Sequence, residues 1–208
     1  MRASPLLRLN RPALRAVAAV LLAGLALGLL PGASRWMAGK TVPVPESDFC
    51  LVAPPTPYNP ASGLALQAAR PVPADARCPV CGMYPARAPA WAAQVIFSNG
   101  DAQFFDSPLS LFMYLNDVAR FSPGRSAGDI VARYVTDFDS RQMLDAASAF
   151  YVVGSSAQGP MRAGNLPAFG SEQAARTFAE QRGGEVRAFA EIDTVLVAQL
   201  GGRSGHRH

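Results

Sequence analysis

The same order of strand and helix signals occurs twice along the chain, and this repeat limits the folds that the chain can adopt. Phe105 and Phe169 hold matching positions in the two copies, about 64 residues apart, and a serine follows each of them two residues later. Each copy reads as two strands, a helix and a third strand. The pattern predicts an α+β fold with two tandem ββαβ units, over about residues 88–137 and 148–200.

A hairpin signal opens the first unit. Asn99 and Gly100 lie between two apolar runs, 91–97 and 102–105, and an Asn-Gly pair in this position favours a tight turn between antiparallel strands. A helix that begins after a capping Asp or Ser and runs to about residue 120 is expected next. A strand over 130–136 then completes the unit.

The second unit is expected to contain three strands and a helix, and a last helix closes it. The expected strands are 150–154, 166–169 and 185–189, and the expected helices are 172–181 and 191–200. Gly183 and Gly184 are typical of the end of a helix and favour a stop after the first of these two.

The first 35 residues have the layout of an export signal. Four arginines precede an apolar run of 15 residues, from Ala16 to Leu30. This run is shorter than the roughly 20 residues of a spanning helix, yet long for the apolar part of a cleaved signal. We favour an uncleaved signal anchor over residues 1–35, with a cleaved signal peptide as the alternative. In both cases the basic flank stays cytoplasmic, so the folded part is expected in the periplasm, at the inner membrane.

A proline-rich segment follows the expected anchor. Residues 36–75 are expected to act as a semi-rigid tether, because proline-rich linkers stay extended. Cys50 lies within it, in a small apolar island. The folded domain is expected over 76–202, and the tail 203–208 is expected to be disordered.

Composition and charge exclude two classes of protein. The net charge is only +4 and much of it lies at the two ends of the chain, so the folded part lacks the basic stripe of a nucleic-acid-binding protein. The only two histidines, His206 and His208, lie in the tail. A Ser/His/Asp or Cys/His catalytic set is therefore excluded from the folded part, and no enzymatic activity is expected.

Sulfur atoms form the one constellation that indicates a specific chemistry. Cys78, Cys81 and Met83 place three of them within six residues, and two residues between the cysteines allow a tight turn that directs both thiols to one point. Met161 lies between a Gly-Pro pair and an arginine, on an expected loop. Thiolate and thioether ligands select soft ions, above all Cu(I). Structural zinc sites use four Cys or His ligands, which this part of the chain does not offer.

Two other uses of the cysteines remain open. Exported cysteines tend to pair, so a Cys78–Cys81 or Cys50–Cys78 disulfide is possible, although three cysteines leave one over. The Cys78/Cys81 pair also suits a thiol–disulfide oxidoreductase. In thioredoxin-like proteins, however, the first cysteine begins a helix, and Pro85 and Pro89 would interrupt a helix that began at this motif. Metal binding is the favoured interpretation.

At these residues the chain resembles the NosL family of nitrous-oxide reductase accessory proteins. The segment 78–83 resembles the opening motif of the family. Further motifs follow in family order, and the resemblance covers about residues 77–190. The further motifs are 104–107, 134–137, 145–146 with 151–155, and 159–161.

The resemblance implies a periplasmic Cu(I) chaperone that supplies the copper centre of nitrous-oxide reductase, with that enzyme and its maturation machinery as partners. It also implies a fold of two ββαβ units. Cys78, Cys81, Met83 and Met161 match family positions proposed to ligate or flank the metal. A cysteine together with Met161 is favoured, with Met83 in reserve.

The chain departs from the family pattern in three respects. Most members are lipoproteins with a cysteine just after the signal, whereas this chain has an apolar anchor and a proline-rich tether. Arg162 follows Met161 where the family often has a glycine. An imidazole ligand is missing from the folded part.

Asp137, Asp139 and Asp145 resemble a cluster of hard metal ligands in the sequence. Their surroundings read as a turn and a helix start, however, so capping of backbone N–H groups is the favoured role.

Overall fold

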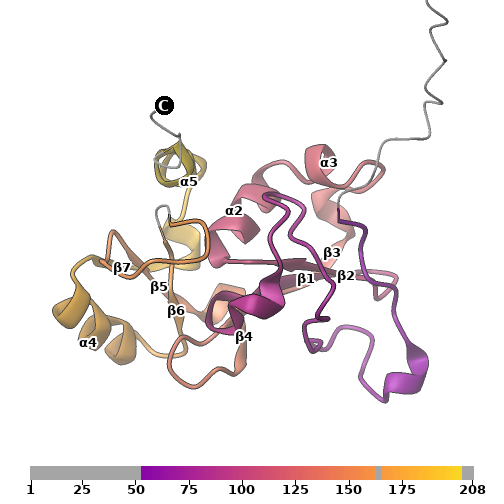
Figure 1. Cartoon of the computed structure of the whole chain (residues 1–208), viewed down its shortest axis with the longest axis horizontal. Coiled ribbons are helices and arrows are strands. Elements are labelled where there is room, and N and C mark those ends of the chain that lie inside the picture. The colour runs from indigo at the N-terminus through magenta and orange to yellow at the C-terminus, as the bar shows by residue number, and fades with distance from the viewer. Residues whose placement is uncertain (1–52, 163–164, 203–208) are drawn as a thin grey trace, which may run out of the picture. The chain divides into compact units, whose positions relative to one another are not determined.

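A computed structural model describes residues 53–162 and 165–202, which belong to one compact unit spanning Cys50–His208 (Figure 1). The expected anchor over 1–35, Cys50 and the tail 203–208 lie outside the described residues. Within the described ranges, no helix has the length and apolar character needed to cross a membrane.

Four antiparallel strands form the first sheet. They are β1 (Ala93–Phe97), β2 (Ala102–Phe105), β3 (Ile130–Thr136) and β4 (Met143–Asp145), and their order is β2-β1-β3-β4. The expected strands over 102–105 and 130–136 are confirmed, while β4 was not expected. Every residue of β1 and β2 is buried, so both faces of this hairpin are covered.

The Asn-Gly signal does produce the turn between β1 and β2. Gly100 donates a backbone hydrogen bond to Phe97 (2.8 Å) and has a φ of +84°. A Cβ at this position would lie 2.5 Å from the Leu66 side chain and 2.9 Å from that of Tyr58. Gly100 therefore serves both the turn and the close approach of an earlier segment of the chain.

The helix expected to end near residue 120 is divided in two. Helix α2 (Pro108–Asn116) begins after Ser107, whose side chain accepts a hydrogen bond from the Ser110 backbone (3.3 Å). Asp117 leaves the helical conformation and caps α3 (Val118–Phe121) instead. An aspartate can compete for backbone N–H groups in this way, which explains the break.

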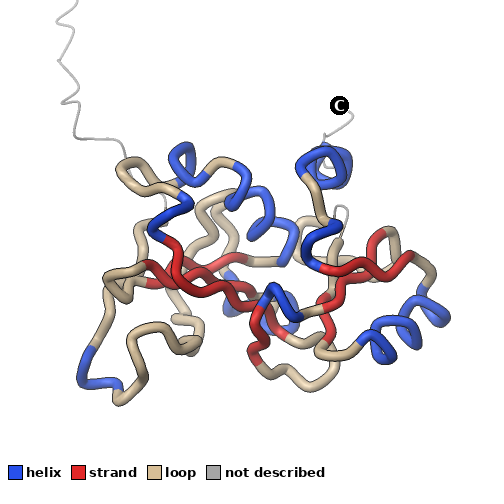
Figure 2. Tube along the Cα trace, turned by 180° about the vertical axis from the view of Figure 1, so that it is seen from behind, coloured by secondary structure: helices blue, strands red, loops and turns tan. Residues whose placement is uncertain are grey.

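The second sheet is smaller and also antiparallel. It contains β5 (Phe150–Val153), β6 (Ala168–Phe169) and β7 (Glu185–Ala188) in the order β6-β5-β7. Helix α4 (Glu172–Arg182) lies between β6 and β7 in the sequence, and α5 (Thr194–Gly202) ends the described chain. Figure 2 shows the two sheets as separate groups of strands. The mixed α/β class is confirmed.

Short 3-10 helices join several of these elements. They are η2 (Pro60–Ser62), η3 (Pro85–Arg87), η4 (Pro89–Trp91), η5 (Ala127–Asp129), η6 (Ala146–Ser148) and η7 (Phe189–Glu191). Prolines begin the first three of them. Because η4 includes Trp91, the expected strand over 91–97 starts only at Ala93.

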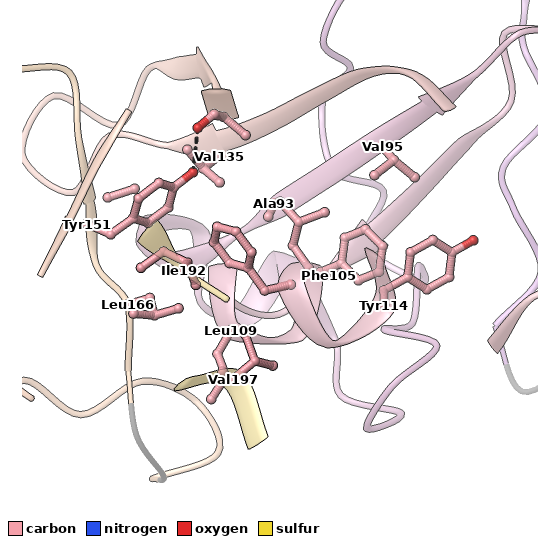
Figure 3. Packing of buried hydrophobic residues seen from close by; sticks show 14 of the residues in the cluster. Ala93, Val95, Phe105, Leu109, Tyr114, Val135, Tyr151, Leu166, Ile192 and Val197 are labelled. Atoms are coloured by element: carbon pink, nitrogen blue, oxygen red, sulfur yellow. Dashed lines mark hydrogen bonds between the residues drawn. The ribbon is translucent and has the colours of Figure 1, made fainter. Parts of the chain in front are cut away.

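One hydrophobic core lies between the two halves (Figure 3). Val135 of the first sheet belongs to the same cluster as Tyr151 and Leu166 of the second half and Val197 of α5. Helix α2 also packs against α5. The Tyr151 hydroxyl donates a hydrogen bond to the carbonyl of Ala146 (2.7 Å), which satisfies this polar group inside the core.

Residues 53–75, the described part of the expected tether, do not act as a spacer. Thr56 forms a β-bridge with Ala102, and this segment passes beside β2 in Figure 1. Two hydrogen bonds join the backbone of Arg70 to the side chain of the fully buried Gln94. The Arg70 backbone N–H donates to Gln94 Oε1 (2.8 Å), and Gln94 Nε2 donates to the Arg70 carbonyl (2.9 Å).

The outer face of the first sheet explains this docking. Ile96 and Phe104 point away from the main core and form a second cluster with Ala102. Val72 and Ala76 pack against this cluster and remove it from water. The segment therefore lies as a strap along the sheet.

The capping role expected for the aspartates is confirmed for Asp137 and Asp145. Asp137 accepts hydrogen bonds from the backbone of Asp139 (3.0 Å) and Ser140 (2.7 Å), and Asp145 caps η6. Asp137 also accepts one from the Gly170 backbone (2.6 Å), which ties the first half of the chain to the second.

Candidate metal centre

The cysteine loop is closed by two backbone hydrogen bonds. Cys78 donates its N–H to the carbonyl of Met83, and Gly82 donates its N–H to the carbonyl of Cys78, each at 2.8 Å. Gly82 has a φ of +73°, a conformation that glycine adopts without the strain of a side chain. The chain therefore reverses within six residues, as the two-residue spacing of the cysteines predicted.

The structure brings the two thiols together and adds a carboxylate that the sequence analysis missed. The Sγ atoms of Cys78 and Cys81 and a carboxylate oxygen of Asp106 all lie within 4.8 Å of one another. Cys78 is fully buried and Cys81 is half-buried, and both are free thiols. The Cys81 thiol donates a hydrogen bond to Asp106 Oδ1 at 3.2 Å.

Asp106 reaches the thiols from the junction of two elements. It follows the last residue of β2 and precedes Ser107, the N-cap of α2. Its side chain is fully buried, and its Oδ2 atom has no hydrogen-bond partner among the described residues. From the sequence, Asp106 or Ser107 was equally suited to cap the helix. Because Ser107 takes the cap, the carboxylate of Asp106 is available to the cysteines.

The surroundings of the thiols disfavour ionisation of Cys81 in the metal-free protein. Hydrogen bonding with the Cys78 side chain, burial, and the nearby charge of Asp106 all raise the pKa of the Cys81 thiol well above its usual range. A redox-active thiol needs the opposite, a lowered pKa at an accessible position. Cys78 is also fully buried. The structure therefore does not support the thiol–disulfide oxidoreductase alternative.

The two methionines singled out in the sequence lie in different environments. The side chain of Met83, at the end of the cysteine loop, is 37% exposed. Met161 is half-buried and packs against the main hydrophobic cluster. Cys78 is part of this cluster, and Cys81 also packs against it. The Met161 thioether therefore borders the main core, as Cys81 does.

The Met161 loop is held by a buried side chain that sequence reasoning missed. Asn165 donates a hydrogen bond from Nδ2 to the carbonyl of Ala157, across the base of the loop, and is only 9% exposed. The Asn165 side chain also lies against Gly159, where a Cβ would be 2.4 Å from Oδ1 and 3.5 Å from the Trp91 ring. Glycine is the residue that leaves room for this contact.

The soft donor atoms of the cysteine loop differ in how deeply they are buried. A buried thiol, a half-buried thiol and an exposed thioether follow one another along a single loop. Thiolates and thioethers favour soft metal ions, whereas the Asp106 carboxylate is a hard donor. In chemical terms this is a candidate set of soft donors with a buried end and an exposed end.

Comparisons with known proteins place these features in one family. The NosL family model matches residues 69–197 of the chain. The copper-binding lipoprotein NosL of Stutzerimonas stutzeri is 33% identical over 123 residues, which cover 59% of this chain and 64% of that protein. The chain therefore spans less than two thirds of the length of this curated relative.

A solved structure agrees with the sequence comparison. The crystal structure of the copper chaperone NosL from Shewanella denitrificans matches with a TM-score of 0.55 and 25% sequence identity, and the match covers 62% of this chain and 98% of that one. The first of these proteins is named a copper-binding lipoprotein and the second a copper chaperone, and neither name is that of an enzyme. The matched family model covers both sheets, the cysteine loop and the Met161 loop, and the chain belongs to the NosL family.

Proposed function

We propose that this chain is an exported accessory protein that binds one Cu(I) ion and delivers it to nitrous-oxide reductase. The single observation that carries the proposal is the approach of the Cys78 and Cys81 thiols and the Asp106 carboxylate to within 4.8 Å of one another. Membership of the NosL family and the copper-related descriptions of two relatives support it.

The proposed ligands are Cys78, Cys81 and Met161, with Met83 as a further thioether. The two thiols are preorganised, because the loop that bears them is closed by backbone hydrogen bonds. Met161 would join them from a second loop, whose base is bridged by the hydrogen bond from Asn165 to Ala157. A sulfur-only set matches the preference of Cu(I) for soft ligands, and it also suits an ion that needs only two or three donors.

The proposed delivery step is a ligand exchange that starts at the exposed end of the site. Met83 is 37% exposed, whereas Cys78 is fully buried. A donor on the partner protein would reach the ion from the Met83 side and replace the outer ligands first. The buried thiol would be the last to release the ion, so copper would not be lost to water during transfer.

We further propose that the folded part works in the periplasm at the inner membrane, in the maturation of nitrous-oxide reductase for denitrification. The basic flank and apolar run within residues 1–35 support export and anchoring.

Copper binding is tested on the reduced full-length chain, with Cu(I) competed against a strong chelator. Wild-type protein is expected to retain about one Cu(I) per chain. Cys78→Ser should abolish retention, because it removes the innermost soft donor. Met161→Leu, which conserves volume, should weaken retention. Met143→Leu is the matched control, because Met143 lies on β4 and its sulfur contacts Gln94 (3.6 Å).

Equal retention by wild type, Cys78→Ser and Cys81→Ser would refute the copper site. Delivery is tested separately, by mixing the loaded chain with copper-free nitrous-oxide reductase and following the copper content and activity of the enzyme. Activation at a rate no faster than with free chelated Cu(I) would refute delivery while leaving copper binding intact.

A further inference from the structure

Two guanidinium groups lie over the same aromatic ring beside the cysteine loop. The Cζ atoms of Arg77 and Arg87 are 4.2 and 4.3 Å from the ring centroid of Tyr84. Both arginines are exposed, and Tyr84 directly follows the exposed Met83. Cation–π contacts of this kind hold an arginine in place while its charge stays accessible to a partner.

These two charges are not neutralised by an ion pair within the described residues. Asp75 lies two residues before Arg77 and is exposed, and residues 76–100 contain no Asp or Glu. Among the described residues, neither Arg77 nor Arg87 takes part in an ion pair. They differ in this from Arg125, Arg176 and Arg187, which pair with carboxylates at 2.5–2.6 Å.

The pair is unusual in a region where acids outnumber bases. The described residues contain 11 arginines and 13 acidic residues, and no lysine. The Asp106 carboxylate beside the thiols is fully buried and accepts the Cys81 hydrogen bond. The outer surface at Arg77 and Arg87 is thus locally cationic on a body that is otherwise slightly acidic.

The two arginines differ in how much of their hydrogen-bonding capacity is used. Arg77 donates to the carbonyl of Gly82 (3.2 Å) and to the Tyr84 hydroxyl, so it also supports the cysteine loop. Arg87 makes no hydrogen bond with its guanidinium within residues 53–162 and 165–202, and its contact is with the Tyr84 ring. Its planar fork of donors is free for a carboxylate, which it can bind in bidentate fashion.

We infer that Arg77, Tyr84 and Arg87 form a docking surface for an acidic patch on the protein that receives the copper ion. The inference rests on the proposed delivery function, because it assigns these residues to the partner's approach at the Met83 end of the site. Complementary charge speeds such an encounter and fixes its orientation, so the partner's incoming ligand meets the exposed thioether first.

The test compares copper transfer to copper-free nitrous-oxide reductase at low and high salt. For wild type, the second-order rate of transfer should fall steeply as salt is added. Arg77→Gln with Arg87→Gln should lower the low-salt rate about tenfold and remove most of the salt dependence. Arg176→Gln with Arg187→Gln removes the same charge from α4 and β7 and should leave the rate within about twofold.

Two further variants separate docking from damage to the loop. Arg87→Gln alone should slow transfer several-fold while Cu(I) affinity stays within about twofold of wild type, because Arg87 makes no hydrogen bond to the loop. Arg77→Lys with Arg87→Lys should recover the salt dependence, since it restores the charge. A fall in Cu(I) affinity that fully accounts for the slower transfer would overturn the inference.

A 12-residue polyglutamate peptide makes docking measurable even if delivery fails. Salt-sensitive binding by wild type and the α4/β7 control, lost in the Arg77/Arg87 double variant, supports the docking surface whether or not copper reaches the enzyme. Equal peptide binding by all three proteins refutes it. Preference for phosphatidylglycerol vesicles over the peptide, through the same two arginines, would assign the surface to a membrane and also refute the inference.

Discussion

The Cys81 thiol donates a hydrogen bond of 3.2 Å to Asp106, a fully buried carboxylate whose second oxygen has no partner among the described residues. A buried carboxylate oxygen without a partner costs stability. Such a cost is typical of functional sites, where a group is kept for its chemistry. Asp106 is therefore the residue at which stability and metal handling are expected to oppose each other.

Asp106→Asn tests this opposition. The neutral amide keeps the shape of the side chain and an acceptor for Cys81, but it removes the buried charge. The metal-free, reduced protein should become more stable by about 1 kcal/mol, while Cu(I) retention against a chelator should fall. Urea unfolding and chelator competition measure the two effects. A loss of stability of the metal-free protein would show instead that the carboxylate is a structural element.

Gly82 provides a test of preorganisation in the cysteine loop. Its φ of +73° strains any residue with a Cβ, at about 1–2 kcal/mol for alanine. Gly82→Ala should therefore lower Cu(I) affinity severalfold by displacing the loop. Gly82→Asn should recover part of the loss, because asparagine tolerates left-handed backbone. If both variants bind Cu(I) as tightly as wild type, the loop conformation is not needed for binding.

Gly159 tests the link between Asn165 and the Met161 loop. An alanine Cβ there would lie 2.4 Å from the Asn165 side chain, so the loop must shift. Gly159→Ala should cost about 1–3 kcal/mol in unfolding free energy and weaken Cu(I) retention in the manner of Met161→Leu. Gly128→Ala is the control, since its Cβ would meet only Ser126 Oγ, at 3.6 Å. Normal copper retention by Gly159→Ala would separate the loop from the site.

The contribution of Asp137 to the free energy of unfolding is expected to depend on pH. Burial works to raise the pKa of Asp137, but hydrogen bonds from the backbone of Ser140 and Gly170 outweigh it and hold the pKa below its ordinary value of 3.8. The stabilisation is therefore fully present above this value and is lost as the pH falls through the folded-state pKa. Asp137→Asn should lower stability at neutral pH by about 2 kcal/mol.

The same variant should also show a smaller loss of stability than wild type on acidification, because it lacks the titrating group. Unfolding curves measured from neutral pH down to about pH 3 make the comparison. Parallel losses in the two proteins would mean that other carboxylates dominate acid unfolding.

The sequence predicted the parts of this molecule that depend on local chemistry. The strand over 102–105 follows from the Asn99-Gly100 turn and an apolar run, and the aspartate caps follow from short polar side chains next to free N–H groups. The closure of the cysteine loop follows from the spacing of Cys78 and Cys81. Each of these features is decided within a few residues.

The features that the sequence analysis missed depend on contacts between distant segments. A proline-rich segment suits a strap along a sheet as well as a free tether. The outer-face apolar residues of the first sheet and the buried amide of Gln94 decide in favour of the strap. The role of Asp106 is decided in the same way, by the position of Cys81 in the folded chain.

X-ray absorption at the copper edge tests the central claim most directly, on the reduced full-length chain loaded with Cu(I). A first shell of two or three sulfur atoms is expected. One of these sulfurs should disappear in Met161→Leu, and the whole shell should be lost in Cys78→Ser. A shell made of nitrogen or oxygen, or a spectrum that Cys78→Ser leaves unchanged, would contradict the assignment of the copper ion to these sulfur atoms.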